Sequence, residues 1–448
     1  MTTSLPSQFL APADRRVLYT DLDHQRQRNA GDMQSIHASG GMAEDSASAL
    51  LESVSLYLHV PFCHVKCHYC DFTSYAGVLR LREPFVTALR DEIFLAGKRT
   101  QREYGEKVRC RTIFFGGGTP SLLTADQVAL LLEAAREAFT VDADAEISLE
   151  ANPGALEYNH LDELRALGVN RLSMGAQSFD AALLRWMGRI HSPEDVERAF
   201  HAARAAGFDN INLDFMYALP GQSLESWRAT LERALALGPD HLSLYSLIVE
   251  EHTPLHRWVA EGKVTPPDED LAADMYDHAR DRLREAGYTH YEISNWARPG
   301  RECRHNLTYW RNLPYLGLGA GAHSWYAGHR YMEAKSLREY TDRVNAAIAL
   351  GDPSAGASLP AAITEDETIS RELEMAETVM LSLRLTAGVA EADFERRYGQ
   401  SLESVFAERL REARAAALVE TVDGRLRLTE RGLLLGNEVF AALLPDVD

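Results

Sequence analysis

An apolar run leads into Tyr57-Leu58-His59-Val60-Pro61-Phe62-Cys63-His64-Val65-Lys66-Cys67-His68-Tyr69-Cys70-Asp71-Phe72, which holds three of the five cysteines of the chain. The run alternates apolar and other residues from Val54 to Val60, which predicts a β-strand. Pro61 ends the strand because proline cannot donate a hydrogen bond to a ladder. The cysteines follow with C-x3-C-x2-C spacing. We therefore expect a loop at a strand end that can turn three thiolates toward one point.

Three thiolates suit two kinds of metal site. Soft sulfur ligands select zinc, copper(I) or iron–sulfur clusters. A structural zinc site takes four protein ligands, and His64 or His68 is available as the fourth. A four-iron cluster held by only three cysteines keeps one iron free for a substrate. The spacing alone leaves both alternatives open.

The whole stretch resembles the radical S-adenosylmethionine (SAM) superfamily, since an aromatic residue, Tyr69, stands just before the last cysteine. More narrowly, Tyr57-x-His59-Val60-Pro61-Phe62-Cys63 resembles the anaerobic coproporphyrinogen III oxidase (dehydrogenase) group. The resemblance implies a [4Fe–4S] cluster on Cys63, Cys67 and Cys70, with SAM on the fourth iron. The cofactor would supply the difficult chemistry, and the protein would bind and orient it.

Phe72 departs from the pattern of the dehydrogenases proper, which carry a further cysteine at this position (C-x3-C-x2-C-x-C). Cys70-Asp71-Phe72 instead resembles the sister branch, the HemW-type heme chaperones or coproporphyrinogen oxidase-like proteins. This branch implies a heme carrier.

Composition limits the class of protein. The 448 residues are 46 % apolar and 25 % charged, as in ordinary globular proteins, and are enough for one large and one small domain. A net charge of −20 argues against nucleic acid as a main partner. No apolar run approaches a membrane span. Five cysteines, three of them clustered, predict a reducing cytoplasm rather than a disulfide framework.

We expect three segments. Residues 1–52 are polar, with a Ser/Ala/Gly-rich end, and predict a flexible extension in which Phe9 to Tyr19 is a candidate docking segment. A start assigned too far upstream is the other explanation for this extension. Residues 53–369 alternate predicted strands and helices, which implies a parallel sheet. We predict an α/β fold, a partial (β/α) barrel of the radical SAM type, with functional residues at the carboxyl ends of the strands.

Residues 370–448 form the third segment, a helix–hairpin–helix cap. We expect a helix over Leu402 to Leu418, a hairpin turning at Asp423-Gly424, and a final helix capped by Thr429 that runs to Leu444. This order resembles a winged helix. DNA binding is not expected, because residues 371–448 hold 10 Arg and no Lys against 15 acidic residues.

Several residues at predicted strand ends match positions at which the resembled family contacts SAM. Gly116-Gly117-Gly118-Thr119 follows a strand, and its amides can bind a carboxylate, although a simple turn is the alternative. Asp214 lies within an apolar strand, where a carboxylate needs partners. A guanidinium such as Arg189 can fork onto the methionyl carboxylate. The full set that the resemblance implies is Tyr57, Tyr69, Gly117, Gly118, Thr119, Glu150, Gln177, Arg189, Asp214 and Ile248.

His305 is the first candidate for heme contact. It opens His305-Asn306-Leu307-Thr308-Tyr309-Trp310, which resembles the H-N-x-x-Y-W motif of the heme-chaperone branch, and histidine is a common axial ligand of heme iron. His323 and Cys303 are weaker candidates. The alternative for His305 is a satisfied loop histidine beside packed aromatic side chains.

We therefore predict a heme chaperone or heme carrier that binds a cluster, SAM and heme, and that passes heme to acceptor proteins. The main alternative is an oxygen-independent coproporphyrinogen III dehydrogenase, which decarboxylates two propionates to vinyl groups. A heme-degrading radical SAM methyltransferase and a plain zinc module come behind these. The sequence leaves open whether SAM cleavage is catalytic, and a homodimer is compatible with it.

Overall fold

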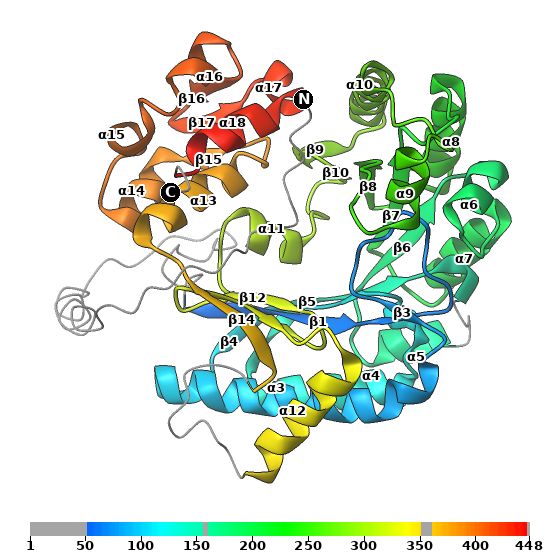
Figure 1. Ribbon diagram of the computed structural model, residues 1–448, viewed down its shortest axis with the longest axis vertical. Helices are drawn as coiled ribbons and strands as arrows, with labels where there is room; N and C mark the ends of the chain where they lie inside the picture. Colours follow the sequence, from blue (N-terminus) through cyan, green and yellow to red (C-terminus); the bar gives the residue numbers. More distant parts are fainter. Residues whose placement is uncertain (1–51, 156–159, 351–360, 446–448) are drawn as a thin grey trace. The chain divides into compact units, whose positions relative to one another are not determined.

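A single large sheet organises the chain in the computed structural model, which describes residues 52–155, 160–350 and 361–445 (Figure 1). The expected extension over residues 1–52, with its candidate segment Phe9 to Tyr19, lies outside the described residues except for Glu52. The sheet has twelve strands. Their order is β14 (Ile363–Thr368), β13 (His329–Glu333), β12 (His323–Tyr326), β11 (Tyr315–Leu318), β1 (Ser53–Val60), β4 (Arg109–Gly117), β5 (Thr140–Ala151), β6 (Arg171–Gln177), β7 (Ile211–Tyr217), β8 (His241–Ser246), β10 (Asn295–Ala297) and β9 (Thr289–Glu292).

The strands from β11 through β8 are parallel, and the strands beyond them on both edges are antiparallel. The edge strands β14 and β9 are not paired with each other, so the sheet stays open. This arrangement confirms the predicted α/β class with a mostly parallel sheet. Because parallel strands share one carboxyl edge, loops far apart in sequence meet there.

Helices follow the strands as βα units require. Figure 1 shows α3, α4 and α12 on one side of β1 and β4. Thr124 and Gln127 form a capping box on α4, and Ser192 caps α7 with Pro193 at its first position. The helices are α3 (Arg82–Tyr104), α4 (Ala125–Ala138), α5 (His160–Ala166), α6 (Ala181–Met187), α7 (Pro193–Ala205), α8 (Leu224–Leu237), α9 (Pro254–Ala260), α10 (Glu269–Glu285), α11 (Arg304–Trp310) and α12 (Leu337–Ala349).

The two faces of the parallel sheet differ in chemistry. Successive side chains of a strand point to opposite faces, and the strand registers align the polar residues of neighbouring strands. One face carries the apolar positions that form the main core with the helices, including Leu56, Leu58, Ile147, Leu149, Leu172, Leu213 and Leu242. The other face carries Ser55, Tyr57, His59, Thr112, Glu146, Ser148, Glu150, Arg171, Ser173, Asn212, Asp214, His241 and Ser243. A polar interior of this size provides hydrogen-bonding groups for a polar ligand.

The C-terminal segment has its own apolar cluster, formed by residues between Met375 and Leu443. The predicted hairpin is confirmed, with Asp423 and Gly424 at positive φ between β16 (Val419–Val422) and β17 (Arg425–Leu428). Its other elements are α13 (Arg371–Ser382), β15 (Val389–Ala390), α14 (Glu391–Tyr398), α15 (Leu402–Phe406), α16 (Arg411–Ala415), α17 (Glu430–Leu434) and α18 (Gly436–Leu443).

Two helices in this segment were predicted too long. The expected helix Leu402 to Leu418 is split into α15 and α16, although its apolar residues still pack into one cluster. The expected final helix is split at Leu435, whose φ and ψ of −112° and 24° leave the helical region. Gly432 and Gly436 flank this break, and glycine is a poor helix former. Apolar spacing alone cannot reveal such breaks, because both pieces bury the same stripe.

Candidate functional site

The cysteine loop leaves the carboxyl end of β1 as expected. Cys63 lies in the two-residue strand β2 (Phe62–Cys63), which pairs with β3 (Tyr75–Ala76). The Tyr75 amide donates to the Pro61 carbonyl at 2.7 Å, and the Gly118 amide donates to Val60 at 2.9 Å. Both ends of the loop are therefore fixed to the sheet, and all three loop cysteines are free thiols of intermediate burial.

Hydrogen-bond donors surround the thiols. The Thr119 hydroxyl lies 3.7 Å from Cys63 Sγ, and the Arg189 guanidinium lies 3.6 Å from Cys67 Sγ. Burial is the main cause that raises the pKa of the Cys70 thiol to about 11, so a bound metal would have to displace its proton.

Within residues 52–155, 160–350 and 361–445, no three His, Cys, Asp or Glu side chains are grouped closely enough to hold a metal ion. A cluster would therefore have to draw the three sulfurs of the cysteine loop together. The residues nevertheless suit an iron–sulfur cluster. Three soft ligands lie on one loop, and the buried Arg189 Nε beside them has no hydrogen-bond partner.

The glycine segment at the end of β4 contacts the next strand. The Gly117 amide donates to Glu150 Oε2 at 3.0 Å. Gly117 has a φ of 114°, and an added Cβ would lie 2.6 Å from the His59 ring, so only glycine suits this position. Burial, and then the charge of Asp214, raise the pKa of Glu150 to about 7. A carboxyl group with this pKa can accept or donate a hydrogen bond near neutral pH.

Asp214 and Tyr57 complete this side of the site. Asp214 accepts hydrogen bonds from Ser173 Oγ at 3.1 Å and from Asn212 Nδ2 at 2.7 Å, which are the partners that a carboxylate in a strand needs. Burial raises the pKa of Asp214 despite these bonds. Burial is the main cause that raises the pKa of Tyr57, and the charge of the nearby Glu150 raises this pKa further. The structure thus brings Tyr57, Gly117, Glu150 and Asp214 together.

Gln177 is the last residue of β6, and Arg189 follows α6. The Arg189 guanidinium donates to the Gly175 carbonyl at 2.7 Å and also contacts Cys67. Gln177 has a φ of 64°, which is unusual for a residue other than glycine, and its amide lies over Gly175. Tyr69 lies near Arg189, whose charge partly offsets the rise in the tyrosine pKa that burial causes.

Ile248 differs from the other predicted SAM residues. It is 60 % exposed and lies beyond the end of β8, whereas Tyr57, Glu150 and Asp214 are enclosed in the site. Its place in a SAM site stays a prediction.

His305, the heme candidate, is 1 % exposed at the start of α11. Both of its ring nitrogens have partners, since Nδ1 lies 2.7 Å from Thr112 Oγ1 and Nε2 lies 2.8 Å from the Tyr309 hydroxyl. Its backbone amide donates to Glu146 at 3.0 Å. Burial is the main cause that lowers its pKa to about 3. Coordination of heme iron by His305 would require one of these ring hydrogen bonds to break.

Of two further histidines in the motif, His59 was not predicted as a site residue, and His68 was considered only as a zinc ligand. His59 Nε2 donates to the Thr73 carbonyl at 2.8 Å, so its Nδ1 accepts from the Tyr57 hydroxyl at 3.0 Å. His68 Nδ1 donates to the Trp186 carbonyl at 2.9 Å, and the ring packs edge-on against Trp258. Their place in the motif, two residues after Tyr57 and directly after Cys67, was the signal that could have identified them.

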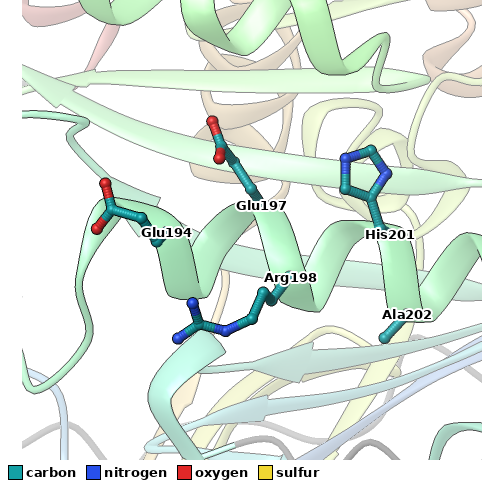
Figure 2. Close-up of a pocket in the computed structure, with 5 residues that line it drawn as sticks. All are labelled: Glu194, Glu197, Arg198, His201 and Ala202. Atoms are coloured by element: carbon teal, nitrogen blue, oxygen red, sulfur yellow. The ribbon is translucent and has the colours of Figure 1, made fainter.

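Two surface pockets among the described residues are lined by different sets of residues. One adjoins the cysteine loop and is lined by His64, Val65, Cys67, Thr119, Asn152, Gly188, Arg189 and Ile190. The other lies along α7 and is lined by Glu194, Glu197, Arg198, His201 and Ala202 (Figure 2). Glu194 and Glu197 pair with Arg233 across the surface. The α7 pocket holds no predicted site residue.

The fold and the cysteine loop define a radical SAM protein. The profile of the radical SAM superfamily matches residues 57–234, and the HemN C-terminal domain matches residues 369–435. This class implies a [4Fe–4S] cluster and SAM.

The chain belongs to the HemW family of heme chaperones. It is 37 % identical over 394 residues to heme chaperone HemW of Bacillus subtilis, covering 88 % of this chain and 100 % of that protein. It is 41 % identical over 276 residues to HemW of Escherichia coli, covering 61 % of this chain and 70 % of that one. Among solved structures, coproporphyrinogen III oxidase HemN of Escherichia coli, a radical SAM enzyme, has 26 % identity and a TM-score of 0.72 over 89 % of this chain and 92 % of its own.

Proposed function

We propose that this protein binds heme and delivers it to acceptor proteins, as the name of its relatives states for them. The observation that carries the proposal is the match along the full length of the Bacillus subtilis heme chaperone. Phe72 supports it, because the coproporphyrinogen dehydrogenases place a further cysteine at this position.

In this proposal, Cys63, Cys67 and Cys70 hold the [4Fe–4S] cluster. The glycine segment with Gly117, Gly118 and Thr119 lies against the amino acid part of SAM, and Arg189 binds its carboxylate. The remaining polar groups of SAM are contacted by Tyr57, Glu150, Gln177 and Asp214. The edge of the SAM site is formed by Tyr69 and Ile248. SAM beside a reduced cluster supplies one-electron chemistry, and the protein excludes water from it.

A second candidate is coproporphyrinogen III dehydrogenation. The likeness to HemN over most of both chains favours it, and the polar interior of the sheet suits a substrate with several carboxylates. Two observations argue against this second function. Phe72 stands where the dehydrogenases have a cysteine, and the chain is 37 % identical in sequence to a heme chaperone.

We divide the described chain into two segments, residues 53–369 and 370–448, since the apolar cluster of the second segment begins at Met375.

We also propose a cytoplasmic location, which the five free cysteines support. None of the described helices is both long and apolar enough to cross a bilayer. A homodimer is part of the proposal because two copies would allow heme to pass between chains.

The test compares the two functions on one sample. Protein with a reconstituted cluster receives reductant, SAM and coproporphyrinogen III without oxygen, and any protoporphyrinogen is oxidised to its fluorescent porphyrin. A parallel sample is titrated with heme and followed by the Soret band. Saturable heme binding without porphyrin turnover is the expected result. Many turnovers of product would make the protein a dehydrogenase, and the absence of heme binding would reject the carrier.

A further inference from the structure

Three residues lie on segments that contact one another beside the carboxyl end of β1. Phe72 belongs to the cysteine loop, His323 begins β12, and Lys335 precedes α12. The Thr73 side chain lies where a Cβ on Gly321 would be, with Thr73 Oγ1 2.9 Å from that point. The Tyr75 hydroxyl donates to the Lys335 carbonyl at 2.9 Å. The residues that follow Phe72 thus contact the segments that carry the other two side chains.

All three side chains are exposed. Phe72 is 60 % exposed, which is unusual for an aromatic residue on a loop that is fixed at both ends. His323 and Lys335 are also exposed, whereas the next residues of β12, from Ser324 to Tyr326, are buried.

The ring of His323 is free to act as a ligand. No hydrogen bond involves this ring among the described residues, in contrast to the rings of His305 and His59. Partial burial, followed by the charges of Lys335 and Arg330, lowers its pKa. The imidazole is therefore neutral near pH 7 and keeps the lone pair that binds a metal.

Lys335 is the available cation of this group. Arg330 is already committed, because it donates to both carboxylate oxygens of Glu377 at 2.6 Å. Lys335 forms no ion pair with another described residue. A carboxylate of a bound ligand can therefore pair with Lys335 without breaking an existing contact.

From this geometry we infer that Phe72, His323 and Lys335 form a cradle for heme, with His323 as the axial ligand of the iron. The inference rests on the proposed heme-carrier function and gives that function a site. Heme is a flat apolar ring that carries two propionates. Phe72 stacks against the ring, and Lys335 pairs with a propionate.

This cradle differs from a site at His305 in accessibility. Heme can approach His323 from solvent, whereas His305 is enclosed by Thr112, Tyr309 and the backbone of α11. Phe72 lies two residues after Cys70, so the conformation of the cysteine loop sets the position of one wall of the cradle.

The test is a titration of the full chain with hemin, followed by the Soret band and by the spin state of the iron. His323→Ala should weaken hemin binding at least tenfold and change the Soret spectrum, and added imidazole should restore the spectrum of the wild type. Phe72→Ser and Lys335→Glu should each weaken binding several-fold. His201→Ala and Lys107→Glu, which change exposed residues outside the cradle, are the matched controls and should behave as wild type.

His305→Gln tests the rival site and should keep the spectrum of the wild type. Wild-type hemin affinity and spectrum in His323→Ala would overturn the cradle, whether or not His305→Gln loses them. If the wild-type protein itself binds no hemin, the proposed function fails together with this inference. Circular dichroism of each variant identifies a loss of binding that is caused by unfolding.

Discussion

The Arg189 guanidinium lies 3.6 Å from Cys67 Sγ and donates a second hydrogen bond to the Gly175 carbonyl at 2.7 Å. One side chain thus joins the cysteine loop to the end of β6. Its Nε is buried without a partner, so the guanidinium still has a hydrogen bond to give. The methionyl carboxylate of SAM is the anion that the proposed site would bring to this position.

Arg189→Lys should therefore weaken SAM binding about tenfold, roughly 1.4 kcal/mol. Lysine keeps the charge but cannot hold Gly175 and fork onto a carboxylate at the same time. Isothermal titration of the reconstituted protein with SAM measures the change, and iron analysis should show an unchanged cluster content. Arg185→Lys, on the exposed side of α6, is the control. Equal SAM affinity in Arg189→Lys and wild type would remove Arg189 from the site.

Gly188 is the point at which the cysteine loop contacts the end of α6. An added Cβ there would lie 3.2 Å from the ring of His68, whose backbone amide donates to Met187. The position also has a φ of 78°. Gly188→Ala should push His68 away and lower the iron content after reconstitution several-fold, besides a backbone cost of about 1 kcal/mol.

Gly207→Ala separates these two effects. Gly207 has a φ of 86° but no atom within 4 Å of an added Cβ, so its substitution brings only the backbone cost. Both variants should lose similar stability in urea unfolding, and only Gly188→Ala should lose iron. Equal iron contents in the two variants would mean that the contact of Gly188 with His68 does not position the cysteines.

The sequence predicted the site well where a local rule applies. Pro61 ends a strand, Asp423-Gly424 turns the hairpin, and the glycines at Gly117 and Gly118 lie at the end of β4, as their residue types require. The alternation of apolar and other residues from Val54 to Val60 predicted a strand whose two sides differ in polarity. These features depend on neighbours in the chain, so a single sequence contains them.

Other features depend on contacts between distant segments. The contact of Arg189 with Cys67 spans 122 residues, and the bond between His305 and Thr112 spans 193. The motif around His305 indicated a heme ligand, but burial and two ring partners were decided by the packing of α11 against β4. The breaks after Phe406 and at Leu435 were missed for a similar reason, since both pieces of each helix pack into the same apolar cluster.

Glu377 links the C-terminal segment to the sheet. It is 7 % exposed on α13 and accepts two hydrogen bonds of 2.6 Å from Arg330 of β13. Glu377→Gln should lower the free energy of unfolding by about 2 kcal/mol, because it removes a largely buried charge–charge hydrogen bond. Glu367→Gln is the matched control. Glu367 pairs with the same arginine at 3.5 Å but is 40 % exposed, so its loss should cost less than about 0.5 kcal/mol. Equal losses in urea unfolding would contradict this difference.

Glu92 is a buried carboxyl group on α3 that accepts hydrogen bonds from the Gly319 amide at 2.8 Å and the Tyr340 hydroxyl at 2.6 Å. Burial outweighs these bonds and raises its pKa from 4.5 to about 7. Burial, and then the charge of Glu92, also raise the pKa of Glu333. As the pH rises from about 4.5 to 7, the unfolded chain therefore releases the Glu92 proton while the folded chain keeps it, and stability is lost across this window.

Glu92→Gln should flatten this loss. Between about pH 5.5 and 8, the unfolding free energy of the wild type should fall by about 2 kcal/mol relative to that of Glu92→Gln. Removal of the Glu92 charge also lowers the pKa of Glu333, which changes the difference in the same direction. Urea unfolding at several pH values gives the two curves, and Glu133→Gln on the exposed side of α4 should follow the wild type. Parallel curves for Glu92→Gln and wild type would show that Glu92 is already ionised in the folded protein at low pH.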